Sequence, residues 1–133
     1  MIVDASAILA IVLDEADARR FAEALRRPAA RRMSAINFVE AGVRVDNDPN
    51  PHRGAAFDRA MNAFGISVQN VSPDHATIAR DAYRRFGRGN HPARLNLGDC
   101  FAFALAKATR EPLLFKGDDF AHPDVLAEIE AAA

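Results

Sequence analysis

The sequence predicts an α/β fold, a three-layer α/β/α sandwich in which helices cover both faces of a central, mostly parallel sheet. Short buried strands are expected at residues 1–3, 66–71 and 112–116. Segments with helical spacing of apolar residues separate them, and strands that alternate with helices form parallel sheets covered on both faces. With 133 residues and a hydrophobic fraction of 50%, the chain is expected to form one domain, residues 1–133.

Four helices are expected in the first half of the chain, at residues 5–13, 15–27, 35–45 and 53–64. Ser6 is a candidate N-cap of the first helix and Ser34 of the third, because a serine oxygen accepts a hydrogen bond from a free backbone N–H. Gly65 is well placed to end the fourth. We interpret three arginine pairs as surface charge, at residues 19–20, 26–27 and 31–32.

The second half of the chain alternates strands with long helices. Residues 66–71 alternate with period two, which predicts a strand. Pro73 at a first-turn position opens a helix that runs to about Phe86. Residues 87–96 are irregular, and residues 87–92 within them are a candidate mobile substrate loop. They are followed by a strongly apolar helix at 97–109, the strand at 112–116 and a weaker tail that ends in a helix.

Composition excludes several classes of function. A net charge of −1 gives no overall attraction to nucleic acid or to anionic membranes, so any such contact must come from a local patch. The lone Cys100 excludes an internal disulfide framework, and the four scattered histidines form no His-x₃-His pair. Residues 1–13 lack a basic n-region and are too short to span a bilayer. The sequence therefore predicts a cytoplasmic protein without a membrane segment.

Four acidic residues stand where an α/β fold forms binding sites. Asp4 and Asp118 each follow a buried strand, and ligands of parallel sheets bind beyond the carboxyl ends of the strands. Glu40 and Asp99 interrupt apolar helical segments, although carboxylates are rarely buried unless they are paired or bind a metal. Because four converging carboxylates repel one another, the sequence predicts a divalent cation among them, Mg²⁺ or Mn²⁺.

Each of these residues also has a simpler interpretation, such as capping a helix, lying in a turn or facing solvent. The four together are harder to explain in this way. Glu40, for example, lies beside the face of the third helix that Val39 and Val43 are expected to bury. The hydroxyl of Ser6 could orient a metal-bound water or cap a helix. Asp119 adjoins Asp118, and at most one of the two is expected to face the same cavity.

A basic stretch contains a single acidic residue, Asp81, among the arginines Arg80, Arg84, Arg85, Arg88 and Arg94. Its simplest interpretation is a solvated helix face followed by a basic loop. Beside a carboxylate site, it is also a candidate clamp for the phosphate backbone of a nucleic acid. Lys116, close to Asp118, could neutralise carboxylates or contact a phosphate.

Four motifs, in order along the chain, resemble those of the PIN-domain ribonucleases, and in particular the VapC toxins of bacterial toxin–antitoxin pairs. They cover residues 1–7, 38–41, 95–100 and 115–120, and the resemblance extends over essentially the whole chain. One such motif alone would be weak evidence. Four in the same order, in a chain of this length, are specific.

The resemblance implies a Mg²⁺- or Mn²⁺-dependent endoribonuclease in which metal-activated water hydrolyses RNA phosphodiester bonds. It also implies a homodimer that is silenced by a cognate VapB-type antitoxin. The family's acidic positions fall on Asp4, Glu40, Asp99 and Asp118, with Ser6 as the accompanying hydroxyl. Asp118 is preferred to Asp119 because it stands in the family's position relative to the flanking phenylalanines.

Two other classes of function remain open at this point. A Mg²⁺-dependent phosphohydrolase or phosphotransfer domain would use Asp4 as a covalent nucleophile. The Asp-x-Asp start typical of one such group is absent, however, because Ser6 stands in its second position. A non-catalytic module that docks a partner protein would leave Glu40 and Asp99 unexplained.

Overall fold

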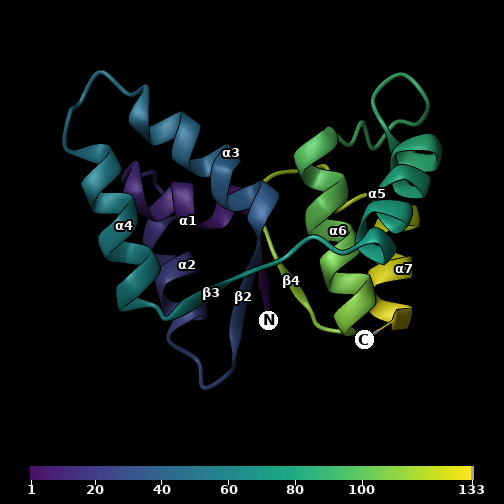
Figure 1. Ribbon diagram of the computed structural model, residues 1–133, viewed down its shortest axis with the longest axis horizontal. Helices are drawn as coiled ribbons and strands as arrows, with labels where there is room; N and C mark the ends of the chain where they lie inside the picture. Colours follow the sequence, from purple (N-terminus) through teal and green to yellow (C-terminus); the bar gives the residue numbers. More distant parts are fainter. Residues whose placement is uncertain (133) are drawn as a thin grey trace.

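A computed structural model describes residues 1–132 as a parallel sheet between two layers of helices, which confirms the expected fold class (Figure 1). Ala133, the last residue of the expected domain, lies outside the described residues. The elements are β1 (Ile2–Val3), α1 (Ala5–Val12), α2 (Ala18–Leu25), β2 (Arg31–Ser34), α3 (Ala35–Asp46), α4 (Arg53–Ala63), β3 (Ile66–Gln69), α5 (Pro73–Phe86), α6 (Leu97–Thr109), β4 (Leu113–Leu114) and α7 (Pro123–Ala132).

The sheet has the strand order β3-β2-β1-β4, and all three neighbouring pairs are parallel. β1 therefore lies inside the sheet, where Ile2 pairs with Leu113 of β4 on one side and with Arg32 of β2 on the other. Beyond the last residue of β1, the N–H of Asp4 donates to the carbonyl of Leu114 at 2.9 Å. The segments that follow β1 and β4 consequently leave the sheet side by side.

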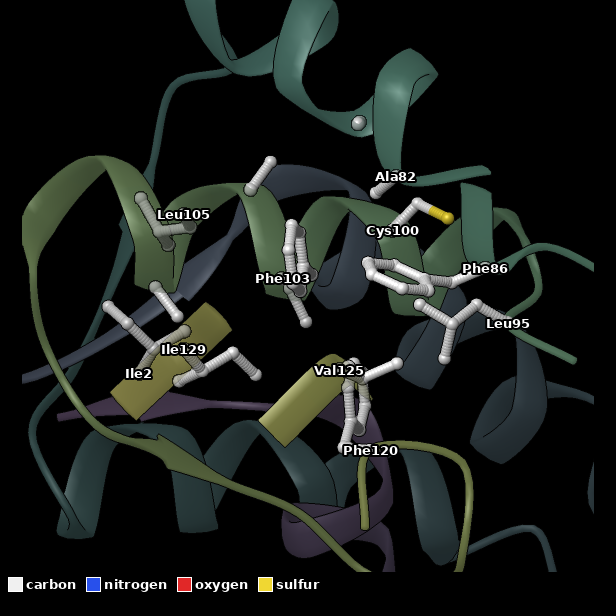
Figure 2. Packing of buried hydrophobic residues seen from close by; sticks show 14 of the residues in the cluster. Ile2, Ala82, Phe86, Leu95, Cys100, Phe103, Leu105, Phe120, Val125 and Ile129 are labelled. Atoms are coloured by element: carbon white, nitrogen blue, oxygen red, sulfur yellow. The ribbon is translucent and has the colours of Figure 1, made fainter. Parts of the chain in front are cut away.

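Two hydrophobic cores lie on opposite faces of this sheet, because successive residues of a strand point to opposite sides. Val3 packs in the core that α1 to α4 cover. Ile2 packs in the core formed by α5, α6 and α7, where it lies near Phe103, Val125 and Ile129 (Figure 2). The strands are short, so this burial of helix faces against them, more than backbone pairing, holds the layers together.

Strand β2 was not expected, and the interpretation of its two arginines as surface charge is wrong. Both are half-buried. The Nε atom of Arg31 donates to the carbonyl of Phe64, and Arg32 forms an ion pair with Glu111. The segment shows no alternation of apolar residues because only its last two residues, Met33 and Ser34, are buried. The arginine pairs at 19–20 and 26–27 are exposed, as expected.

Helix α3 is turned relative to the expected orientation. Val39 and Val43, expected in the core, are 58% and 57% exposed. The buried stripe consists of Asn37, Ala41 and Val45 instead, because the helix packs closely against β2 and the start of α6. Two large apolar side chains are therefore left on the surface.

The other elements follow the expectation with shifted ends. Helices α5 and α6 have the expected bounds, Ser34 caps α3, and α4 ends just before Gly65, whose φ is +61°. The expected second helix is shorter than residues 15–27, and the strands β3 and β4 are shorter than 66–71 and 112–116. Within residues 1–132, no helix combines the length and the apolarity that crossing a membrane requires.

Candidate active site

Asp4 stands at the carboxyl end of β1, where the chain turns directly into α1. Its Oδ2 atom accepts hydrogen bonds from the backbone N–H of Ser6 at 3.0 Å and from the Ser6 hydroxyl at 2.6 Å. Asp4, and not Ser6, is therefore the N-cap of α1. The Oγ atom of Ser6 also accepts from the backbone N–H of Lys116 at 2.9 Å. Ser6 thus joins Asp4 to the segment that follows β4.

The second carboxylate oxygen of Asp4 has no protein partner. Its Oδ1 atom is buried and accepts no hydrogen bond from any described residue. Buried polar atoms are paired in the great majority of cases, so an orphaned carboxylate oxygen requires an explanation. A cation that binds Oδ1 would provide the missing partner.

Asp99 lies in the first turn of α6, where it is both part of a helix cap and part of the site. The N-cap is Asn96, whose Oδ1 accepts from the Asp99 N–H at 2.8 Å, while Asp99 Oδ2 accepts from the Asn96 N–H at 3.0 Å. This reciprocal capping box fixes the rotamer of Asp99. Capping and metal binding, which the sequence presented as alternatives, are therefore compatible.

Glu40 reaches the same place from α3. Its carboxylate lies against the backbone of Gly98, because a Cβ atom built at position 98 would stand 2.0 Å from Glu40 Oε2. Asn37, one turn earlier, donates from Nδ2 to the Gly98 carbonyl at 2.9 Å and to Glu40 Oε1 at 3.4 Å. Neither Asn37 nor Gly98 was identified from the sequence. The only signals are that Asn37 is three residues before Glu40 and that Gly98 directly precedes Asp99.

The site carboxylates act on one another electrostatically, although no three of them bring a ligand atom each within 4.8 Å of one another among the described residues. The pKa of Asp99 is raised to about 7, chiefly by burial and also by the charges of Asp4 and Asp119, against the hydrogen bond from the Asn96 N–H. Burial also raises the pKa of Glu40, with a contribution from the charge of Asp4. The pKa of Asp4 itself is raised by burial, against the hydrogen bonds from Ser6, and the charge of Asp119 adds to the increase.

Asp118 and Asp119, one of which is the candidate fourth carboxylate, are both exposed. Of the two, Asp119 contributes to the raised pKa of Asp4 and of Asp99. Gly117, with φ of +103°, turns the chain between β4 and these aspartates. The assignment of the fourth position to Asp118 stays a prediction.

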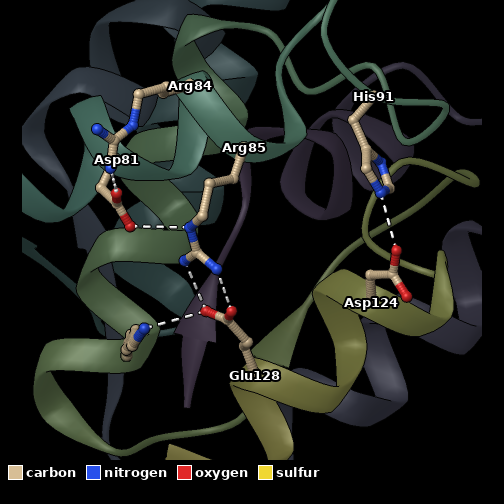
Figure 3. A network of polar contacts seen from close by, with 7 residues as sticks. Asp81, Arg84, Arg85, His91, Asp124 and Glu128 are labelled. Atoms are coloured by element: carbon tan, nitrogen blue, oxygen red, sulfur yellow. Dashed lines mark hydrogen bonds and ion pairs between the residues drawn. The ribbon is translucent and has the colours of Figure 1, made fainter.

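The basic residues are divided between ion pairs and open surface. Arg85 binds Glu128 of α7 through both Nη atoms and also contacts Asp81, which Arg84 contacts as well (Figure 3). These ion pairs leave the guanidinium of Arg85 without a free position for a ligand. Arg80, Arg88 and Arg94 are exposed, and no hydrogen bond or ion pair of their side chains occurs within the described part of the chain.

The side chain of Lys116 pairs with acidic residues outside the carboxylate site. Its Nζ atom pairs with Glu15, and with Asp17 at 2.9 Å, both in the segment between α1 and α2. These hydrogen bonds raise the pKa of Lys116 above its ordinary value. Its backbone N–H, in contrast, supports the site through Ser6.

Comparison with known proteins agrees with this fold. Residues 1–126 match the PIN domain. The chain is 50% identical over 126 residues to Ribonuclease VapC42 of Mycobacterium tuberculosis, which covers 94% of this chain and 96% of that protein. It is 47% identical over 126 residues to Ribonuclease VapC28 of the same species, with 94% and 95% covered. It is 39% identical over 125 residues to VapC ribonuclease Mb0640 of Mycobacterium bovis, again with 94% and 95% covered.

The fold and the site together define this chain as an α/β protein with an acidic site at one edge of its parallel sheet. The site lies beyond the ends of the adjacent strands β1 and β4. Within that class, the match over nearly the whole chain shows that this chain belongs to the PIN-domain family of VapC proteins.

Proposed function

We propose that this protein is a Mg²⁺- or Mn²⁺-dependent endoribonuclease and the toxin of a toxin–antitoxin pair. The observation that carries the proposal is the buried, unpartnered Oδ1 atom of Asp4 among carboxylates that raise one another's pKa. Hard oxygen donors of this kind suit Mg²⁺ or Mn²⁺. The relatives named VapC ribonuclease support RNA as the substrate.

The residues have distinct parts in this proposal. Asp4, held by Ser6, and Asp99, held by Asn96, are the principal ligands of the cation, and Glu40 is a further ligand or orients water. A divalent cation would, when bound, polarise a phosphoryl oxygen. It would also lower the pKa of the water that it binds, so that a nucleophile is available at neutral pH. The protein contributes three carboxylates whose orientations are set before substrate binds. We propose Asp119 as the fourth, in place of Asp118.

We propose that the RNA backbone crosses the surface formed by α5 and the start of α6. A cavity of about 490 Å³ there is lined by Arg80, Arg84, Tyr83 and Leu97 among other residues. A second cavity of about 320 Å³ continues it, lined by Arg88, Asn96 and the same Tyr83 and Leu97. Because Asn96 caps the helix that carries Asp99, this surface leads to the carboxylates. Tyr83, 39% exposed, offers a base a stacking surface.

We also propose that the protein is a single cytoplasmic domain that forms a homodimer and binds a VapB-type antitoxin. The exposed Val39 and Val43 of α3 support a protein partner, since large apolar side chains that stand together on a surface mark interaction sites. They border a cavity of about 260 Å³ that Phe38 and Phe57 also line.

The proposal is tested by incubating antitoxin-free protein with total cellular RNA and mapping the new 5′ ends by sequencing. Discrete cuts are expected with Mg²⁺ or Mn²⁺ and none in chelator. A folded, metal-loaded preparation that cuts no RNA would overturn the ribonuclease proposal. A phosphoryl group trapped on Asp4 would identify a phosphotransfer enzyme instead.

Replacing Asp119 and Asp118 one at a time distinguishes the two aspartates. Asp119→Asn is expected to weaken Mg²⁺ binding by about tenfold, because it removes the charge that acts on Asp4 and Asp99. Asp118→Asn, the matched control, is expected to change the affinity by less than about twofold. The measurement is a calorimetric Mg²⁺ titration at constant pH. The reverse order of effects would return the fourth position to Asp118.

Gly98→Ala is expected to lower Mg²⁺ affinity and cleavage while the protein remains folded. The new Cβ would occupy the place of the Glu40 carboxylate, which must turn away, and a flexible side chain can do so at small cost. Gly42→Ala on α3 is the control, because nothing lies within 4 Å of a Cβ there and alanine favours a helix by about 1 kcal/mol. Equal cleavage by both variants would show that cleavage does not depend on the present position of the Glu40 carboxylate.

Arg80→Ala combined with Arg88→Ala is expected to weaken RNA binding for every sequence tested. Loss of two phosphate contacts should also reduce the slope of log affinity against log salt by about 1 to 2. Arg26→Ala with Arg27→Ala, exposed on the opposite helical layer, is the control of equal charge change. The measurement is RNA affinity at several salt concentrations in the presence of chelator. An unchanged slope of log affinity against log salt would place the RNA elsewhere on the molecule.

A further inference from the structure

Three side chains outside the carboxylate site lie together where the loop at residues 87–96 meets the start of α7. The His91 Nε2 atom is 2.9 Å from Asp124 Oδ2 (Figure 3). The Nδ1 atom of His122 is 3.9 Å from the same oxygen. One donor atom from each residue lies within 4.8 Å of the other two. In the sequence the two histidines are 31 positions apart, so only the fold brings them together.

These separations are close to those of a metal site. Zinc in proteins has bonds to nitrogen and oxygen of about 2.0–2.2 Å in a tetrahedral arrangement, which places neighbouring donor atoms roughly 3.3–3.5 Å apart. Here the two known separations, 2.9 and 3.9 Å, lie on either side of that value. Changes of a few tenths of an ångström would bring both of these separations to that value, and the third, between the two histidines, is at most 4.8 Å.

The packing of the rings keeps the donors in place. The ring of His91 packs edge to face on Phe86, with centroids 5.3 Å apart, and on His122, with centroids 4.6 Å apart. Only 16% of the His91 side chain is exposed, against 61% for Asp124. Two oriented imidazoles thus stand below a carboxylate that faces solvent, and a cation can approach from that side.

We propose that His91, His122 and Asp124 form a binding site for a borderline transition-metal ion of the Zn²⁺ class, with water in the fourth position. Imidazole nitrogen suits Zn²⁺, Ni²⁺ or Cu²⁺, whereas Mg²⁺ and Mn²⁺ prefer an all-oxygen set such as the carboxylate site. The two sites therefore select different ions. The loop site does not depend on whether the protein cleaves RNA.

The hydrogen bonds that both histidines already accept determine what binding costs. The backbone N–H of Asp124 donates to His122 Nδ1 at 3.3 Å, and this hydrogen bond would be lost if the cation bound that atom. The backbone N–H of Ala93 donates to His91 Nδ1 at 3.0 Å, so the neutral ring carries its proton on Nε2, which faces Asp124. A cation at Nε2 requires that this position lose its proton while Nδ1 gains one, and the hydrogen bond from Ala93 is then lost. The amide of Ala93 consequently reports on occupation of the site.

Binding would join two segments that border the carboxylate site. His91 belongs to the loop that leads to Asn96 and α6, and His122 lies three residues after Asp119. A metal held by both histidines would fasten the start of α7 to that loop. The expected consequence is a higher melting temperature with Zn²⁺, because a ligand that binds only the folded state stabilises it.

The test is calorimetric titration of Zn²⁺ into the tag-free full chain with Mg²⁺ in saturating excess, so that the carboxylate site is occupied. One Zn²⁺ per chain is expected to bind, and His91→Ala and His122→Ala should each lower the affinity by more than about tenfold. His52→Ala, at an exposed histidine in another loop, is the matched control and should change nothing. Far-UV circular dichroism confirms that each variant is folded.

A second readout is the amide resonance of Ala93, which is expected to shift on addition of Zn²⁺ in the wild type but not in His122→Ala. Absence of Zn²⁺ binding would show that the three residues form only a hydrogen-bonded contact between loop and helix. Binding that survives His91→Ala and is lost in Asp99→Asn would show that Zn²⁺ enters the carboxylate site. Either result overturns the proposal.

Discussion

Asp99→Asn is expected to abolish RNA cleavage and at the same time to stabilise the metal-free protein. Asparagine keeps an oxygen that can accept the hydrogen bond from the Asn96 N–H, so the cap of α6 is retained. It removes a charge that burial and the neighbouring carboxylates make unfavourable. One pKa unit corresponds to about 1.4 kcal/mol, and we expect a gain of about 1–3 kcal/mol in the free energy of unfolding above neutral pH.

The same carboxyl group sets the expected pH dependence. Its pKa is raised from 3.8 to about 7 in the folded protein, so between these values the folded chain binds more protons than the unfolded chain. Stability is then highest below the unfolded pKa and decreases as the pH rises through the folded pKa. Asp99→Asn should remove much of this decrease.

Thermal unfolding in chelator across about pH 4 to pH 8, for wild type and Asp99→Asn, measures both effects. Added Mg²⁺ should raise the melting temperature of the wild type above pH 7 and leave the variant nearly unchanged. Asp118→Asn, at an exposed aspartate, is the control for loss of one negative charge. A variant that cleaves RNA at the wild-type rate, or that is less stable than wild type in chelator at high pH, would contradict the mechanism. Stabilisation with loss of activity is the pattern expected where function requires repelling charges.

Local sequence was sufficient to place Asp4 and Asp99. Asp4 follows a strand and begins a helix with no residue between, and Asp99 stands in the first turn of an almost entirely apolar helix. Each position depends only on its neighbours in the chain. Where the two helices begin, the direction of the side chain follows from capping geometry.

Tertiary packing decided what the sequence did not show. Strand β2 begins with Arg31 and Arg32, whose charged ends find partners on Phe64 and Glu111, and no pattern within the strand indicates these contacts. The rotation of α3 depends on how closely it approaches the sheet, which Ala41 permits and Val39 would not. Asp118 and Asp119 follow the same turn at Gly117 and are both exposed, so the sequence alone does not show which of them acts on Asp4 and Asp99.

Asn37 illustrates the same limit at the site itself and leads to the second large effect. Asn37→Ala is expected to destabilise the protein by about 1–3 kcal/mol, because it removes a buried hydrogen bond to the Gly98 carbonyl and opens a small cavity. It should also weaken Mg²⁺ binding, since Glu40 loses the hydrogen bond that orients it. Asn62→Ala, at an exposed position of α4, should be nearly neutral in both respects.

A purely structural role for Asn37 and a positioning role differ in one measurement. Denaturant unfolding reports the loss of stability in either case, whereas a Mg²⁺ titration well below the unfolding transition reports the position of Glu40 alone. In a Glu40→Gln background, Asn37→Ala should still destabilise the fold but should no longer change the Mg²⁺ affinity, because the carboxylate it orients is absent. If the affinity falls by the same factor in both backgrounds, Asn37 acts through α6 and Asp99 and not through Glu40.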